Sequence, residues 1–126
     1  MNARTAQQIA APKRPAGPTG LRVVDAAVEL ARDIHRAANG VRGHRDLVDQ
    51  LTRATESIAL NLAEGAGRAG RDKAYHYNVA YGSAGESATA IRLLDAYGAF
   101  PTQRAADLLG RLDQLRAVAW RLAHPG

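Results

Sequence analysis

The sequence predicts an all-α protein, an up-down antiparallel four-helix bundle built from one domain. Apolar residues make up 46% of the 126 residues but aromatic residues only 5%, a balance that favours close-packed helices over a sheet. Apolar residues recur at intervals of three and four along four segments, and glycine or proline lies between the segments. Four helices joined by short turns are most economically arranged with successive helices running in opposite directions.

Residues 1–20 are expected to form a disordered basic tail, and residues 21–126 the bundle. The tail contains Arg4, Lys13 and Arg14 but no acidic residue, and it is rich in proline and glycine. These three residues supply +3 of the chain's formal net charge of +5, so the folded part carries only +2 and is mildly basic. Any anion-binding site must therefore come from local clustering of basic side chains, most of which are arginine.

The first helix is expected over residues 21–39 and the second over residues 45–64. The predicted buried stripe of the first helix is Val24, Ala27, Val28, Ala31, Ile34 and Ala38. The predicted inward positions of the second helix are Leu47, Leu51, Ala54, Ile58 and Asn61. Gly40 ends the first helix, and Gly65 suits the left-handed position that follows a helix C-terminus.

The third helix is expected from Asp72, a good N-cap, to Tyr97, and the fourth is expected to open at Pro101. The predicted inward seam of the third helix is His76, Val79, Ser83, Glu86, Ala90, Leu93 and Tyr97. The predicted inward residues of the fourth helix are Leu108, Leu112, Leu115, Ala119 and Leu122.

Polar residues on the inward seams are expected to pair with one another. An antiparallel turn about residues 68–69 sets Asn61 level with His76, and either side chain alone would cost about 1–3 kcal/mol if left unpaired. The residues predicted to form a structural polar network are Asn61, Glu64, His76, Ser83 and Glu86. The network would fix the register of the helices, and a catalytic role is the alternative.

Small and aromatic residues outside the main seams predict an oligomer interface. The residues of this predicted interface are Tyr77, Tyr81, Gly82, Gly85 and Trp120. Large aromatic residues outside a bundle's own core are typical of interfaces, and glycine lets another helix approach closely. The alternative is that the two glycines serve close packing within the chain.

Two motifs resemble a known family. Residues 61–68 read Asn-x-x-Glu-Gly-x-Gly-Arg, and residues 82–86 read Gly-Ser-x-x-Glu. Over roughly residues 20–123 the chain is similar to the bacterial four-helix-bundle proteins encoded in ribosomal RNA intervening sequences. That family includes the accessory variability determinant of diversity-generating retroelements. The present chain departs from the family's pattern at Ala59, where proline is common, and at Tyr75 and Tyr77, where the pattern is more aliphatic.

The resemblance implies an up-down bundle that assembles as a ring-like homopentamer with a basic surface. It also implies binding to nucleic acid and to a reverse transcriptase, which are properties of the retroelement member. From the residues themselves, Arg53, Arg68, Arg71 and Lys73 are predicted to contact the phosphate backbone of RNA or DNA. Three of these surround the glycine-rich turn, where free backbone N–H groups begin the third helix. A solvated loop is the alternative.

The turn also spells G-x-G-x-x-G over residues 65–70, but it follows a helix and so does not predict a dinucleotide fold. An enzyme is weighed as a second class. The spacing of Arg71 and His76 fits metal-independent bundle ribonucleases, although a chain this rich in arginine gives about one such match by chance. Facing Glu-x-x-His pairs, which bundle metalloenzymes need, are missing from the sequence.

These observations favour a non-enzymatic, oligomeric accessory protein that binds nucleic acid. The expected partners are further copies of the chain, RNA or DNA, and by resemblance a reverse transcriptase. No metal or other cofactor is expected. The lack of cysteine and of long apolar runs predicts a cytoplasmic protein that does not enter the membrane. A module that binds only proteins, through Tyr77, Tyr81 and Trp120, is the third alternative.

Overall fold

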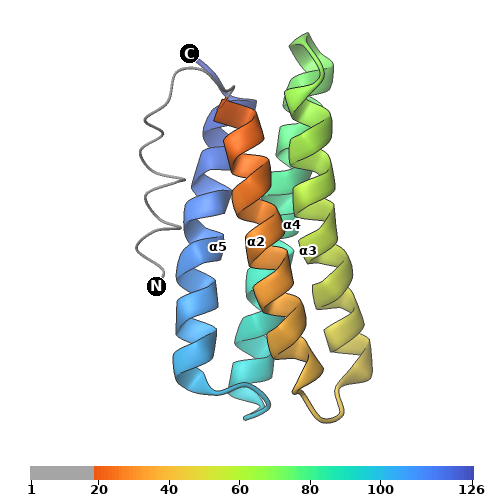
Figure 1. Ribbon diagram of the computed structural model, residues 1–126, viewed down its shortest axis with the longest axis vertical. Helices are drawn as coiled ribbons and strands as arrows, with labels where there is room; N and C mark the ends of the chain where they lie inside the picture. Colours follow the sequence, from red (N-terminus) through yellow and green to blue (C-terminus); the bar gives the residue numbers. More distant parts are fainter. Residues whose placement is uncertain (1–18) are drawn as a thin grey trace.

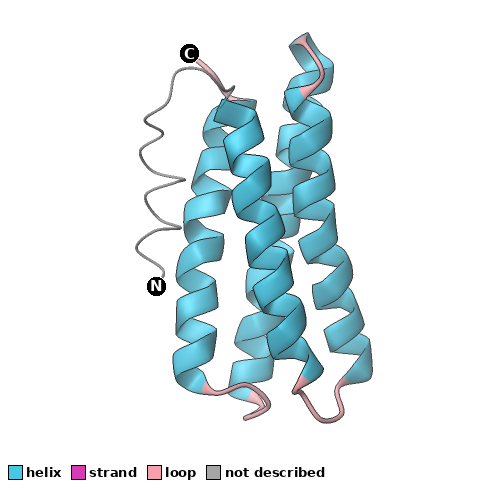
Figure 2. Cartoon of the chain, in the orientation of Figure 1, coloured by secondary structure: helices cyan, strands magenta, loops and turns pink. Residues whose placement is uncertain are grey.

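The computed structural model describes residues 19–126, which form four α-helices and, within that range, no strand (Figures 1 and 2). The helices are α2 (Thr19–Asn39), α3 (Arg45–Ala66), α4 (Gly70–Ala96) and α5 (Thr102–Ala123). The predicted tail lies outside the described residues up to residue 18, while α2 already begins at Thr19.

The helices lie side by side, and the turns between them alternate between the two ends of the molecule (Figure 1). The α3–α4 turn is at the upper end in this view, and the α2–α3 and α4–α5 turns are at the lower end. Among the four pairs of helices that pack along their lengths, the most extensive contact is between α3 and α4, and the least extensive is between α2 and α5. The predicted four-helix bundle is confirmed.

The core consists of aliphatic side chains contributed by all four helices. The largest fully buried aliphatic residues are Val23, Leu30, Ile34, Leu51, Ile58, Leu62, Ile91, Leu94, Leu108, Leu112 and Leu115. Burying a side chain of this size contributes about 1.5–3 kcal/mol relative to its exposure. The inward positions predicted for Leu51, Ala54 and Ile58 are confirmed, as are those for Leu108, Leu112 and Leu115.

The buried stripe of α2 is displaced from the predicted one. Ala27, Ile34 and Ala38 are buried as predicted, but Val28, predicted to be inward, is 54% exposed. Val23, Ala26 and Leu30 are buried although they were not part of the predicted stripe. Apolar residues occupy neighbouring positions along this helix, so several stripes fit the spacing equally well. Packing against α3 and α5 decides which of them faces the core.

The inward seam of α4 is also displaced, by one position. Glu86 is exposed, and so are Leu93 and Tyr97. The residues of α4 that are buried are Tyr77, Ala80, Ser83, Ala84, Ser87, Ala90, Ile91 and Leu94. The helix itself carries small residues on most of its faces, so its apolar periodicity is weak. The spacing alone therefore did not indicate which of two neighbouring seams faces the core.

The α3–α4 turn differs from the predicted one at both helix ends. Gly65 lies inside α3, which continues to Ala66, and Gly67 is its C-cap with φ −95°. Asp72 does not cap α4, because that helix begins at Gly70 and has no side-chain cap. At the start of α5, Pro101 is the N-cap rather than the first helical residue.

Candidate nucleic-acid interface

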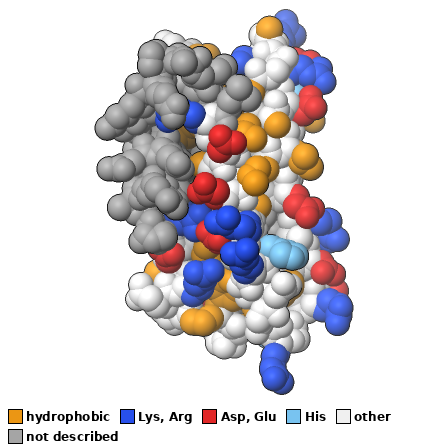
Figure 3. Space-filling view, in the orientation of Figure 1, with side chains coloured by type: hydrophobic (Ala, Val, Ile, Leu, Met, Phe, Trp, Pro, Cys, Tyr) orange, Lys and Arg blue, Asp and Glu red, His pale blue; other side chains and the backbone are white. Residues whose placement is uncertain are grey.

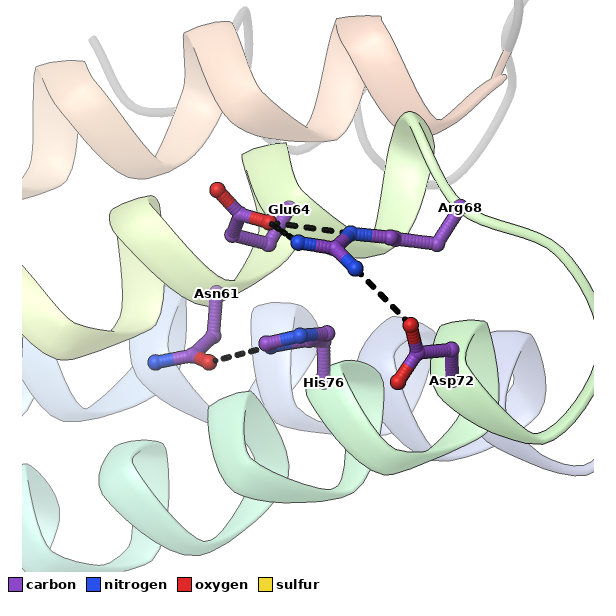
Figure 4. Close-up of polar contacts among 5 residues, drawn as sticks. All are labelled: Asn61, Glu64, Arg68, Asp72 and His76. Atoms are coloured by element: carbon purple, nitrogen blue, oxygen red, sulfur yellow. Dashed lines mark hydrogen bonds and ion pairs between the residues drawn. The ribbon is translucent and has the colours of Figure 1, made fainter.

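Arg68 lies between two carboxylates at the α3–α4 turn (Figure 4). Its Nη2 is 3.0 Å from Glu64 Oε1, and its Nη1 is 2.8 Å from Asp72 Oδ2. The hydrogen bonds that Arg68 donates to Glu64 and Asp72, and then the negative charges of these carboxylates, raise the pKa of the Arg68 guanidinium. Arg68 is therefore ion-paired on both sides of its guanidinium, and its predicted contact with phosphate stays a prediction.

The two ion pairs of Arg68, with Glu64 and Asp72, are called the clamp below, and they correct the role predicted for Glu64. This residue is exposed and pairs with Arg68 across one helical turn, so it does not join the internal polar network. Asp72 forms the other half of the clamp, which links the end of α3 to the first turn of α4. Exposed ion pairs of this kind add little stability, but they neutralise the positive charge that the turn would otherwise display.

The other predicted phosphate contacts lie at two places, Arg71 and Lys73 in the first turns of α4 and Arg53 in the middle of α3. Arg71 is exposed, and Lys73 is half-buried with its Nζ 5.5 Å from the centroid of the Tyr77 ring. Neither takes part in an ion pair within residues 19–126. Arg53 is exposed on α3, roughly 20 Å along the helix from the turn at about 1.5 Å per residue.

An internal polar chain joins α3 to α4, and it contains the predicted pair of Asn61 and His76 (Figure 4). Asn61 Oδ1 and His76 Nδ1 are 2.9 Å apart. The Asn61 amide donates to the backbone oxygen of Ser57 at 3.0 Å and to its Oγ at 3.2 Å. Because that amide donates to Ser57, its Oδ1 is the acceptor, and His76 Nδ1 donates.

The chain continues from Ser57 Oγ to Ser83 Oγ, 2.8 Å away on α4. Asn61, His76 and Ser83 thus lie in the network predicted for them, whereas Glu86 faces solvent. The sequence-based prediction missed Ser57. Its position, one helical turn before Asn61 on the same face, was the signal that could have revealed it.

An ion pair between α2 and α5 was also missed. Arg111 is only 7% exposed, and its Nη1 donates to Asp33 Oδ2 at 2.8 Å. Burial raises the pKa of the Asp33 carboxyl, but Arg111 and then Arg32 outweigh it, and the net pKa lies below its ordinary value. Arg111 occupies a core position between Leu108 and Leu115 at helical spacing, which is the signal that could have indicated a buried partner.

Tyr77 cannot serve the oligomer interface predicted for it. Its side chain is 1% exposed and lies against Gly65, where an added Cβ would be 2.6 Å from Tyr77 Cε1. The prediction failed because the α4 seam was placed one position away. Tyr77 belongs to the core of the bundle.

The remaining residues of the predicted interface lie on the outer side of α4 and α5. Arg116 Nη2 donates to Tyr81 Oη at 3.0 Å, and the guanidinium is 4.3 Å from the centroid of the Tyr81 ring. Gly82 is exposed with no atom within 4 Å of an added Cβ. Trp120 is 46% exposed and stacks on His124 with ring centroids 4.2 Å apart.

A groove of 630 Å³ runs between α4 and α5 beside these residues. Small residues, Gly85, Ala88 and Gly110, form part of its lining, and Arg92 and Arg116 lie at its sides. Of the two glycines predicted to form an interface on α4, Gly82 is open toward solvent, whereas the Arg116 side chain lies over Gly85, with its Nε 3.5 Å from an added Cβ.

Most arginines of the bundle form no ion pair within residues 19–126. The exposed arginines that form no ion pair within residues 19–126 are Arg36, Arg42, Arg45, Arg53, Arg71, Arg92, Arg104 and Arg121. On the face shown in Figure 3, Lys and Arg side chains gather over the lower halves of α2 and α5, with acidic side chains among them. The exposed arginines of those two segments are Arg32, Arg36 and Arg104.

Arg71 and His76 do not form a single site. Five residues along α4 turn their side chains about 140° apart around the helix axis. His76 is half-buried and bonded to Asn61, whereas Arg71 is exposed. Residues 19–126 contain no group of acidic and histidine side chains arranged to hold a metal ion. In the same range, no helix has the length and apolar character needed to cross a bilayer.

The fold and surface define an arginine-rich four-helix bundle in which a chain of hydrogen-bonded side chains joins α3 to α4. A family model described as 23S rRNA-intervening sequence protein matches residues 19–120. The chain belongs to this family, as the motifs of residues 61–68 and 82–86 indicated. A comparison with curated proteins found no match.

Proposed function

We propose that this protein is a non-enzymatic, oligomeric, cytoplasmic accessory protein that binds nucleic acid. The observation that carries the proposal is the set of exposed arginines without acidic partners in the described part of the chain. A guanidinium that is free of carboxylates can form bidentate hydrogen bonds with phosphate. The binding is expected to be dominated by the nucleic-acid backbone and to weaken steeply with salt.

Oligomerisation is the second part of the proposal. The arginines of one bundle are spread over its length, and acidic side chains lie among them, so one copy offers only weak contacts (Figure 3). Several copies that bind one strand add their contacts through effective concentration. We assign the subunit interface to the α4–α5 side, where Gly85 lines the groove, Tyr81 contacts Arg116 of the same lining, and Gly82 and Trp120 are exposed. The resemblance favours a ring of five.

Binding rather than catalysis is supported by the positions of Arg71 and His76. His76 Nδ1 donates to Asn61, which leaves Nε2 as its basic nitrogen, but Arg71 lies about 140° away around the axis of α4. A general base needs a nitrogen within reach of its substrate and a cation placed to stabilise the phosphate. These two residues do not offer that combination.

The finer proposal, taken from the resemblance, is that the protein assists a reverse transcriptase. Free arginines around the bundle would hold the RNA template, and the partner would supply the chemistry. Co-purification of a tagged copy from its native cells, with and without nuclease treatment, tests this part. Recovery of a polymerase in both samples supports it, and recovery of the bundle alone contradicts it.

The main test is binding of a fluorescently labelled RNA, followed by anisotropy across a range of salt concentrations. We expect affinity to fall linearly on a logarithmic scale, with a slope that reports several phosphate contacts. The same samples, incubated without metal and run on a gel, test for cleavage. Absence of binding at low salt would overturn the proposal, and metal-independent cleavage that His76→Ala abolishes would replace it with a ribonuclease.

A further inference from the structure

Two aromatic rings, one from the α2–α3 turn and one from the end of α4, stack on each other at the lower end of the bundle. His44, the N-cap of α3, and Tyr97, the C-cap of α4, stack with ring centroids 5.3 Å apart and planes 14° apart. Figure 1 shows the α2–α3 and α4–α5 turns at this end. Both side chains are exposed, Tyr97 by 57%, so the stacked pair contributes a flat aromatic surface to solvent.

The backbone of His44 is held in an uncommon conformation. With φ 52° and ψ 38° it is the one non-glycine residue of positive φ within residues 19–126, and it follows Gly43, whose φ is 74°. Histidine enters the left-handed region more readily than most residues, but the conformation still costs of order 1 kcal/mol. His44 makes no side-chain hydrogen bond that caps α3. Its position instead places the imidazole on the ring of Tyr97.

A shallow pocket of 440 Å³ opens beside the stacked pair. Leu47, Leu93 and Tyr97 give it apolar surface, and Asp46 and Gln50 bring polar groups from the first turns of α3. A carboxylate accepts hydrogen bonds, and an amide both donates and accepts them. A planar ring with polar edges, such as a nucleobase, matches apolar surface next to such groups.

Arginines without an ion pair in the described residues lie in the pocket lining and in the segments next to it. Arg45 lines it, Arg42 belongs to the same turn, and Arg36 lies in the last turn of α2. All three are exposed, and none forms an ion pair within the described residues. Cations next to an exposed aromatic surface are the combination by which proteins bind single-stranded nucleic acid.

We propose that the lower end of the bundle binds an unpaired base of single-stranded RNA. The base stacks on the His44–Tyr97 pair, its edge faces Gln50 and Asp46, and the neighbouring phosphates contact Arg42 and Arg45. The inference rests on the proposed function, to which it adds the form of RNA and the point of contact. A duplex keeps its bases stacked inside and is a poorer ligand for this site.

The experiment compares two RNAs and two tyrosine variants in anisotropy titrations at fixed salt. The probes are a short unstructured RNA and a blunt duplex of equal phosphate number. Tyr97→Leu is expected to weaken binding of the single strand about tenfold, as loss of base stacking does. The matched control is Tyr75→Leu, because Tyr75 is 61% exposed on the same helix near its other end. It should leave affinity unchanged, and neither variant should alter binding of the duplex.

A second measurement needs no variant and therefore does not depend on folding of Tyr97→Leu. The same single strand carrying abasic sites keeps its phosphates and loses its bases, and wild type should bind it about tenfold more weakly. Equal affinity for the intact and abasic strands, or equal effects of the two tyrosine variants, would overturn the inference and leave the proposed function standing. Absence of binding to every RNA by wild type would overturn both.

Discussion

The ring of Tyr77 lies against the backbone of Gly65, so closely that a Cβ at residue 65 would be 2.6 Å from Tyr77 Cε1. The contact joins α3 to α4, the pair of helices with the most extensive contact in the bundle. Burial raises the pKa of the Tyr77 hydroxyl, in keeping with its place in the core. Gly65 is therefore required by packing across the helix pair rather than by the turn that follows it.

Gly65→Ala is expected to destabilise the bundle by about 1–3 kcal/mol, because the methyl group and the Tyr77 ring cannot both keep their positions. Chemical denaturation followed by circular dichroism measures the change. Gly82→Ala is the control, since Gly82 is helical, exposed and without an atom near an added Cβ. It should stabilise the monomer by up to about 1 kcal/mol. Equal effects of the two substitutions would contradict the packing assignment.

The sequence predicted the number of helices, their approximate bounds and the pairing of Asn61 with His76. The number and bounds of the helices follow from the spacing of apolar residues and from the glycines and prolines between the segments. The pairing follows from counting residues outward from an antiparallel turn. The face of α4 could not be predicted in the same way, because alanine, glycine and serine give a helix little apolar direction. Tyr77 and Glu86 were misplaced for that reason.

The candidate site was less predictable than the fold. Whether an arginine is free depends on which carboxylate its side chain reaches, and Arg68 reaches two. The ion pair of Arg111 with Asp33 joins residues far apart in the chain. The stacking of His44 on Tyr97 likewise depends on two turns that meet only in the folded bundle.

Removing only one charge of the Asp33–Arg111 ion pair is expected to lower the free energy of unfolding more than removing both charges does. Asp33→Asn leaves the buried guanidinium of Arg111 without a counter-charge and should lower stability by about 3 kcal/mol. Asp33→Leu combined with Arg111→Met removes both charges and should recover most of that loss. The measurement is the free energy of unfolding in urea. A double variant less stable than the single one would contradict this account.

The same pair predicts a loss of stability in acid. The pKa of Asp33 is lower in the folded chain than its ordinary value, so its contribution is complete above that ordinary value, about 4. It is lost as the pH falls from there through the folded pKa. Urea unfolding between pH 6 and 2 should therefore show a smaller decline for Asp33→Asn than for wild type. Parallel declines would indicate that other carboxylates account for the acid sensitivity.

Releasing Arg68 from its clamp is expected to strengthen RNA binding. Glu64→Gln with Asp72→Asn frees the guanidinium at the α3–α4 turn and should raise affinity several-fold at low salt. Asp25→Asn with Glu86→Gln is the control, because it removes the same charge from exposed residues that form no ion pair within residues 19–126. Equal gains from both variants would mean that total charge, rather than the position of Arg68, governs binding.

In the function that we propose, several copies of this bundle act together on one nucleic acid through unpaired arginines. Light scattering coupled to size exclusion, at low and high salt and with and without a short RNA, measures both association and binding. We expect a mass that is a multiple of 13.4 kDa and that increases when RNA is added at low salt only. A 13.4 kDa monomer with an unchanged mass in the presence of RNA at low salt would contradict it.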